Sequence, residues 1–196
     1  MEANEKIAWN RKYLEAPEKW LEPDQFLLSA YREFLRDIAP GEALDLAGGA
    51  GRNAIWLAQK GWQVRIIDIS DVGLGFAREK ASKLVQHSGC LETEIADLNA
   101  ISDLGSKRYD LIVVFFFLRR ELFPALIRAL KPGGFLIYKT YTLDRMKVPG
   151  GPGDPRYLLG PNELLRAFTP LRILQYREVL EGKAAAELVA QRDSHG

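Results

Sequence analysis

The sequence of 196 residues is poor in cysteine, in net charge and in long apolar runs. Its one cysteine, Cys90, permits no intrachain disulfide and no metal site built from several cysteines. Lysine and arginine total 27 against 26 acidic residues, which lacks the basic excess typical of nucleic-acid-binding domains. No apolar run approaches the roughly 18 residues of a membrane-spanning helix, and none follows the charged N-terminus as in a signal peptide. These absences predict a cytoplasmic protein without a metal or a membrane as partner. They make a nucleic-acid partner less expected, and they leave the oligomeric state open.

The length fits a single domain, which we expect to span residues 1–196. Within it, residues 1–40 predict a helical N-terminal segment and residues 41–196 predict the core. Asp24 follows a proline and precedes an i, i+3, i+4 spacing of apolar residues, which predicts an amphipathic helix ending near Pro40 and Gly41.

Short apolar runs alternate with helical patterns from Ala43 onward. The runs that predict strands are Ala43–Ala47, Val64–Ile69, Leu91–Asp97, Leu111–Leu118 and Phe135–Thr140. The segments that predict helices are Arg52–Lys60, Asp71–Ser88 and Arg119–Leu130, the last ended by the turn Lys131–Gly134. Alternation of this kind is typical of a parallel sheet with helices on both faces.

The C-terminal part departs from this alternation. Val148–Pro161 is rich in glycine and proline and predicts a loop without regular structure, either a lid over an acceptor or an inert connection. Asn162–Phe168 predicts a short helix, and Leu171–Leu180 with Ala184–Gln191 predicts a hairpin, although the alanines favour helix. The predicted fold is therefore α/β: a single Rossmann-like doubly wound sheet of about seven strands, mostly parallel, with a C-terminal antiparallel hairpin.

A cluster of glycines follows the first predicted strand and opens the first predicted helix. Glycines at this place permit a tight turn and bring backbone amides close to a ligand, which predicts a nucleotide-type ligand at the strand ends. Gly49, Gly51 and Ala54 fit the dinucleotide fingerprint, and Asp68 lies near the expected offset of roughly 20 residues. By spacing alone, the ligand could be NAD.

Two acidic residues favour a different nucleoside. Asp45 lies just before the glycines, where a pyrophosphate would be repelled and an amino-acid ammonium attracted. Asp97 ends the third predicted strand and could accept a hydrogen bond from an adenine amine, or form a plain turn before Asn99. The chain is also short for a full dinucleotide domain with a substrate domain.

Several segments in order resemble class I S-adenosylmethionine-dependent methyltransferases. Leu44–Ala54 is similar to their first motif, with Ala47 in place of the usual first glycine. Ile66–Ser70 is similar to the end of their second strand, and Ala96–Leu98 is similar to their adenine-side acidic turn. Further resemblance runs through Asp110–Leu118 and Leu130–Ile137. Trp9–Tyr13 and Tyr157–Leu165 resemble the small tellurite-resistance-type and thiopurine-type subgroup.

The resemblance implies S-adenosyl-L-methionine as cofactor. The residues that it places on this cofactor are Asp45, Ala47, Gly48, Gly49, Asn53, Asp68, Ile69, Ala96, Asp97, Leu98 and Phe115. Asp45 would orient the methionine end, Asp68 the ribose hydroxyls and Asp97 the adenine. Asp45 could instead be a buried acid that caps the following turn.

Catalytic residues are open, with candidates at or just after the ends of the fourth and fifth predicted strands: Phe117, Arg119, Tyr138 and Tyr141. The rings could face a sulfonium or pack in the core, and Arg119 could attract an anion or lie in solvent. Methyl transfer depends chiefly on alignment, and no histidine base is evident near these strand ends. This favours a small acceptor such as a thiol or a chalcogen oxyanion like tellurite. The alternatives are a nicotinamide-dependent oxidoreductase and a non-catalytic module that binds S-adenosylmethionine.

Overall fold

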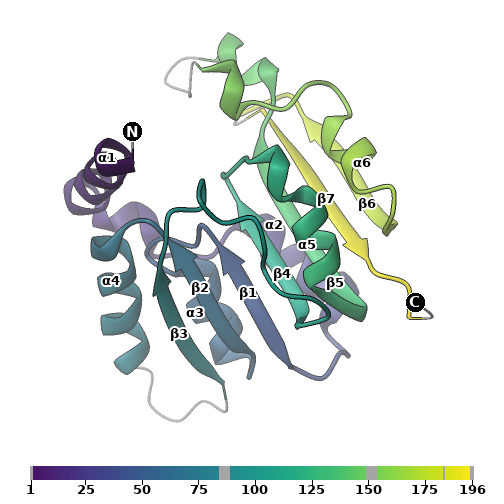
Figure 1. Cartoon of the computed structure of the whole chain (residues 1–196), viewed down its shortest axis with the longest axis horizontal. Helices are drawn as coiled ribbons and strands as arrows, with labels where there is room; N and C mark the ends of the chain where they lie inside the picture. The colour runs from purple at the N-terminus through teal and green to yellow at the C-terminus, as the bar shows by residue number, and fades with distance from the viewer. Residues whose placement is uncertain (1, 84–88, 149–153, 183, 195–196) are drawn as a thin grey trace. The chain divides into compact units, whose positions relative to one another are not determined.

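The computed structural model describes residues 2–83, 89–148, 154–182 and 184–194, and the chain forms two compact units (Figure 1). The first unit runs from Met1 to Ile101 and the second from Ser102 to Gly196. The N-terminal helical segment therefore belongs to the same unit as the first three strands. Among the described residues, no helix is long and apolar enough to cross a membrane.

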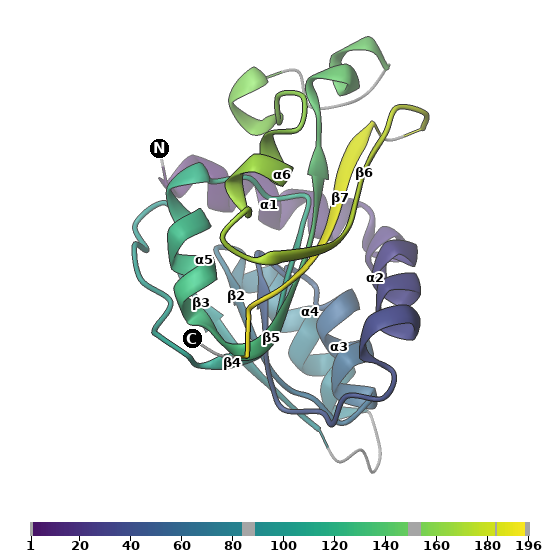
Figure 2. The same ribbon diagram turned by 90° about the vertical axis from the view of Figure 1, so that its right-hand side faces the viewer.

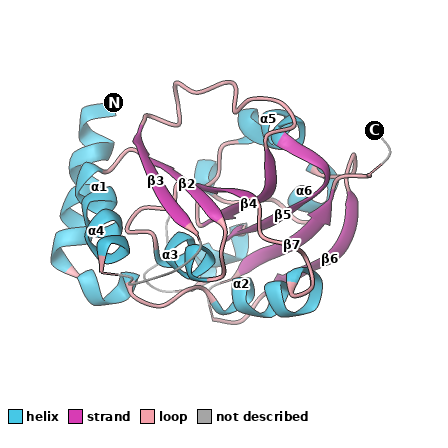
Figure 3. Cartoon of the chain, turned by 90° about the horizontal axis from the view of Figure 1, so that it is seen from below, coloured by secondary structure: helices cyan, strands magenta, loops and turns pink. Residues whose placement is uncertain are grey.

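Three parallel strands form the sheet of the first unit. In the order β3-β2-β1, they are Cys90–Ile95, Gln63–Asp68 and Glu42–Leu46. The helices α3 (Arg52–Gln59) and α4 (Asp71–Ser82) pack against these strands (Figure 3). Because all three strands run the same way, their carboxyl ends, and the turns that follow, lie along one edge.

The N-terminal segment of this unit consists of four short helical elements. They are α1 (Glu2–Glu15), η1 (Pro17–Trp20), α2 (Gln25–Ala30) and the π-helical turn η2 (Tyr31–Leu35). Asp24 caps α2 as its position predicts, since its Oδ1 accepts a hydrogen bond of 2.9 Å from the Phe26 amide. The predicted helix is too long at its C-terminal end, because the π turn ends the regular structure at Leu35.

The second unit contains a four-stranded sheet in the order β4-β5-β7-β6. These strands are Tyr109–Phe115, Leu130–Tyr141, Ala185–Gln191 and Arg172–Val179. The β4 and β5 pair is parallel, whereas β7 pairs antiparallel with both of its neighbours. The helices are η3 (Arg120–Leu122), α5 (Phe123–Ala129) and α6 (Glu163–Ala167), of which α6 packs near the C-terminal hairpin (Figure 2).

Several predicted boundaries are corrected in the structure. The predicted turn Lys131–Gly134 lies within β5. It makes the pairing of β4 with β5 irregular, because Tyr109 pairs with Leu130 whereas Leu111 pairs with Phe135. The predicted loop Val148–Pro161 contains the 3-10 turn η5 (Pro155–Tyr157), and η4 (Leu143–Lys147) precedes it. Residues 149–153 of this predicted loop, for which a lid and an inert connection both stayed open, lie outside the described residues, as does the predicted helical stretch 84–88.

The strand β7 forms against the local helix preference of its alanines. Its residues 185–190 are all buried, and the strand lies between β5 and β6. The position of β7 in the sheet therefore overrides local propensity, as predicted from the hairpin pattern. Glu187 on this strand forms an ion pair with Lys139, in which Oε1 and Nζ lie 3.0 Å apart. The side chain of Glu187 is only 5% exposed and that of Lys139 only 13%. Arg177 on β6 also pairs with Glu187.

The exchange Glu187→Ala leaves the Lys139 ammonium buried without this counter-charge. We expect a loss of about 3–5 kcal/mol in the free energy of unfolding, measured by guanidinium denaturation. The double exchange Lys139→Met with Glu187→Leu removes both charges, and we expect it to cost less than the single exchange. Equal losses in the two variants would contradict the assignment of this pair as a buried, mutually compensated one.

Candidate cofactor site

A turn of left-handed residues follows β1 and leads into α3. The φ angles are positive at Ala47 (58°), Gly49 (54°) and Gly51 (73°). Gly51 is the N-cap residue of α3. The Ala47 amide donates a hydrogen bond of 2.8 Å to the carbonyl of Ile67 on β2. Ala47 therefore adopts the conformation that explains a glycine in the family pattern, at the steric cost that a Cβ imposes there.

The glycines of this turn are required by packing within the protein. A Cβ on Gly48 would lie 2.7 Å from the carboxyl carbon of Asp45, and one on Gly49 would lie 1.7 Å from the hydroxyl of Tyr13. The same atom on Gly51 would lie 2.8 Å from Ala77. The sequence predicts that these glycines leave room for a ligand, whereas in this structure the room is filled by side chains of the same unit.

Two carboxylates lie beside this turn, at the ends of β1 and β2. Asp45 is buried, and its Oδ2 accepts a hydrogen bond of 3.1 Å from the Ala54 amide. Burial raises the pKa of Asp45 to about 7, because it outweighs the opposing effect of the nearby Arg52 charge. Asp68 accepts 2.9 Å from the Gly49 amide and 2.8 Å from the Ser70 amide, and burial raises its pKa despite these bonds. Both acids are therefore poised to gain from a cation placed nearby.

The third strand contributes the turn at residues 96–98. The Ala96 amide donates 3.0 Å to the carbonyl of Asp68, which joins the ends of β2 and β3. Asp97 is half-buried, and its Oδ1 accepts 2.8 Å from the Asn99 amide, so it forms the turn that the sequence left open as an alternative. Leu98 is buried and Ile69 is half-buried. The expected residues of the first unit thus gather along one edge.

Asn53 lies at the start of α3 but its oxygen faces another part of the unit. Its Oδ1 accepts 2.9 Å from the Asp24 amide, and the neighbouring Arg52 pairs with Asp24 at 3.7 Å. In this structure, Asn53 therefore ties α3 to the start of α2.

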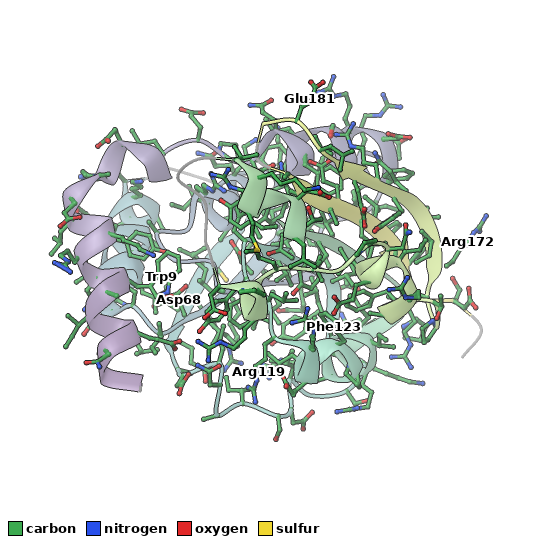
Figure 4. All side chains as sticks on the ribbon, turned by 90° about the horizontal axis from the view of Figure 1, so that it is seen from above. Trp9, Asp68, Arg119, Phe123, Arg172 and Glu181 are labelled. Atoms are coloured by element: carbon green, nitrogen blue, oxygen red, sulfur yellow. The ribbon has the colours of Figure 1, made fainter. Side chains whose placement is uncertain are left out.

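Tyr13 is part of this site although it was not among the expected site residues. Tyr13 is 4% exposed. Its hydroxyl packs against Gly49 and its ring packs against Gly73. The pKa of this hydroxyl is raised by burial and by the charges of Asp68 and Asp45. The signal in the sequence was the segment Trp9–Tyr13, which resembles the small methyltransferase subgroup, and Figure 4 shows Trp9 on the side of α1 turned toward Asp68.

The aromatic candidates of the second unit divide between core and strand end. Phe115 is buried, and Tyr138 packs against Phe123 while its hydroxyl donates 2.9 Å to the carbonyl of Phe117. Burial raises the pKa of Tyr138. The structure therefore uses Tyr138 for packing, whereas Tyr141 is half-buried near the strand end.

The two arginines after β4 have different partners. Arg119 forms an ion pair with Glu121, in which Nε and Oε2 lie 3.7 Å apart. Arg120 pairs with both carboxylate oxygens of Glu163 and donates to the carbonyls of Arg156 and Leu158. Arg120 therefore fastens the segment around η5 and the start of α6 to η3.

Solved structures of low sequence identity share this fold. The structure of TehB from Haemophilus influenzae has a TM-score of 0.70 and 22% identity, and covers 85% of this chain and 61% of that one. Magnesium protoporphyrin IX methyltransferase from Synechocystis, solved with bound SAH, has a TM-score of 0.72 and 18% identity, and covers 98% of this chain and all of that one. The predicted Rossmann-like α/β fold with seven strands and a C-terminal antiparallel hairpin is confirmed.

Comparisons of sequence agree with the fold. The family described as "Tellurite resistance protein TehB" matches residues 27–182. A curated relative from Haemophilus influenzae, named "Probable S-adenosyl-L-methionine-dependent methyltransferase TehB", is 30% identical over 149 residues, which are 72% of this chain and 49% of the relative. The chain spans about half the length of the curated relatives it matches.

The fold of this chain is the one that solved S-adenosylmethionine-dependent methyltransferases share. Within this fold, the chain belongs to the family of the tellurite resistance protein TehB.

The exchange Ala47→Gly removes the strain of a left-handed alanine but adds freedom to the unfolded chain. Because the first effect is worth about 1–2 kcal/mol and the second about 0.4–1, we expect a net gain of about 0.5–1 kcal/mol in unfolding free energy. The control Ala54→Gly, in the first turn of α3, should instead cost about 1 kcal/mol. A loss of stability in Ala47→Gly would show that the turn is not strained at this residue.

Asp45 predicts a pH dependence of stability. Its pKa is about 7 in the folded protein and 3.8 without the fold, so its neutral form favours folding at low pH. This contribution is lost as pH rises from about 4 to about 7, by about 4 kcal/mol at 1.36 kcal/mol per unit. We therefore expect Asp45→Asn, measured by denaturation between pH 4 and 8, to gain stability relative to the wild type as pH rises. A difference that stays constant over this range would refute the assignment.

Proposed function

We propose that this chain transfers a methyl group from S-adenosylmethionine to a small acceptor. The observation that carries the proposal is the pair of desolvated carboxylates, Asp45 and Asp68, at the ends of adjacent parallel strands. A cofactor with an ammonium and ribose hydroxyls offsets the cost of burying these acids, whereas a pyrophosphate beside Asp45 increases it. The relatives named for S-adenosylmethionine support the same choice over a nicotinamide cofactor.

Each acid has a separate task in this proposal. Asp45 orients the ammonium of the methionine end, and Asp68 accepts from the ribose hydroxyls with oxygens already aligned by the amides of Gly49 and Ser70. Asp97 accepts from the adenine amine. When bound, the cofactor would supply a methyl group activated by its sulfonium, and an acceptor lone pair would bond to the methyl carbon as the carbon–sulfur bond breaks. The protein then has to align the acceptor and exclude water.

For the acceptor we propose an anion, with a chalcogen oxyanion such as tellurite as the first candidate and a thiolate as the second. Phe116 and Tyr141 lie with their ring centroids 4.8 Å apart, and Arg145 lies 5.7 Å from the Tyr141 ring. Among the described residues, the buried Nε of Arg145 has no hydrogen-bond partner. An unsatisfied guanidinium donor beside aromatic rings favours an oxyanion. The family's description supports the same class.

Ligand binding separates the cofactor hypotheses. We expect S-adenosylhomocysteine to raise the melting temperature of the wild type, NAD(H) to leave it unchanged, and Asp68→Ala to abolish the shift while the protein remains folded. The exposed acid Asp103 provides the control Asp103→Ala, which should keep the shift. Stabilisation by NAD(H) alone would reject the methyltransferase and favour an oxidoreductase.

Labelled donor and a panel of tellurite, selenite and small thiols test the acceptor. We expect methylated product from an oxyanion, and Arg145→Met should raise the KM for that acceptor about tenfold or more without changing the affinity for S-adenosylhomocysteine. Lys147→Met on the same turn is the matched control, because Lys147 is exposed and pairs with Asp144. Tight cofactor binding with no product from any acceptor would favour the non-catalytic module.

A further inference from the structure

We propose that the ion pair of Arg120 with Glu163 positions Arg145 for the methyl acceptor. Arg120 is a positioning residue in this proposal, because it acts on the acceptor only through the backbone that leads to Arg145. The inference rests on the proposed function, since it concerns the same acceptor site. All three residues belong to the second unit.

The two charged side chains bind one short backbone segment from both of its ends. The guanidinium of Arg120 donates hydrogen bonds of 3.0 Å to the carbonyl of Arg156 and 2.9 Å to that of Leu158. The same guanidinium donates two hydrogen bonds to the carboxylate of Glu163. That carboxylate also accepts a hydrogen bond of 2.8 Å from the Gly160 amide. These bonds hold the backbone before and after a single residue.

Leu159 is that residue, and it connects the segment to the end of β5. Its side chain is buried. Its amide donates a hydrogen bond of 2.9 Å to the carbonyl of Tyr141, and its carbonyl accepts one of 2.9 Å from the Leu143 amide. Leu159 thereby forms a parallel bridge with Thr142, the residue between these two. The backbone that the ion pair holds is therefore bonded directly to the start of η4.

The turn η4 carries Arg145 and fixes both its backbone and its side chain. The Arg145 amide donates a hydrogen bond of 2.9 Å to the carbonyl of Thr142, and its Nη1 donates one of 3.3 Å to the carbonyl of Val148. The guanidinium lies 5.7 Å from the ring of Tyr141, and its buried Nε has no hydrogen-bond partner among the described residues. A displacement of η4 would therefore move this donor relative to the ring beside it.

The ion pair is better suited to orienting the backbone than to stabilising the fold. The side chain of Arg120 is 41% exposed and that of Glu163 is 25% exposed, and water screens the attraction of such pairs. The guanidinium nevertheless forms four hydrogen bonds through all three of its nitrogens. Because a guanidinium is a rigid planar fork, these bonds fix the carboxylate and the two carbonyls relative to one another. A lysine at this position would keep the charge and lose the fork.

The first test measures the KM for tellurite, or for the small thiol that the wild type methylates instead. We expect Arg120→Met to raise this KM about 2- to 10-fold without changing the affinity for S-adenosylhomocysteine, and Arg120→Lys to raise it less. In the Arg145→Met variant, adding Arg120→Met should change the KM by less than about twofold, because the residue through which Arg120 acts is gone. Arg128→Met is the matched control, since it removes an exposed arginine from α5 of the same unit.

Hydrogen exchange follows the connecting backbone without any turnover. We expect the amides of Leu143 and Leu159 to exchange about 2- to 10-fold faster in Arg120→Met, as the loosening of one hydrogen bond implies. The amide of Leu136, in the middle of β5, should keep its wild-type rate. An ion pair that only stabilised the fold would instead speed exchange at all three amides alike.

The outcomes separate this proposal from the proposed function. If the wild type transfers the methyl group but Arg120→Met leaves the KM unchanged, or if its effect multiplies with that of Arg145→Met, the positioning role is wrong and the proposed function stands. Unchanged exchange at the connecting amides would also refute it. If Arg120→Met does not fold, Arg120→Lys and Glu163→Gln provide the same comparisons. If the wild type methylates no acceptor, both proposals fall.

Discussion

The burial of two carboxylates at neighbouring strand ends is the constraint on which the first unit of this protein depends. Asp45 and Asp68 lie on β1 and β2, which pair in parallel, so their side chains meet at one edge of the sheet. Removing a carboxylate from water disfavours its charged form, and only hydrogen bonds or a nearby cation offset this cost. The amides of Ala54, Gly49 and Ser70 supply part of that compensation.

The other features of the edge follow from this arrangement. The turn after β1 directs the Gly49 amide at Asp68 through a left-handed backbone at Gly49, which glycine adopts freely. Gly48 lies against Asp45, where a Cβ would have no room. Tyr13 of α1 is buried against the same turn, at Gly49. Two acids buried at this cost would bind a cationic ligand more strongly, because such a ligand would supply the missing counter-charge.

The sequence predicted the parts of this structure that depend on local pattern. The spacing of apolar residues, with the glycines and prolines between the elements, placed β1, β2 and α3 to within two residues. The positions of Asp45, Asp68 and Asp97 beside strand ends followed from the predicted parallel topology. It predicted β7 correctly because a hairpin around Gly182 and the family resemblance together outweighed the helix preference of its alanines.

Features that depend on contacts distant in sequence were not predictable. The contact of Tyr13 with Gly49 joins residues 36 positions apart, and α1 has polar residues on its inner face, so periodicity gave no sign of what it covers. Tyr138 was expected as a catalytic candidate, but the pairing of β5 with its neighbours turns its ring into the core beside Phe123. The twist and register of the sheet decide which side of it a strand residue faces.

The charge state of Asp45 links the fold to the proposed chemistry most directly. With a pKa of about 7, Asp45 is largely protonated at pH 6, and an ammonium bound beside it favours its ionised form. Titration calorimetry of S-adenosylhomocysteine at pH 6, in buffers of different ionisation enthalpy, counts the protons exchanged on binding. The account predicts that the wild type releases protons and that Asp45→Asn does not. Binding without proton release, or equal release in the two proteins, would contradict it.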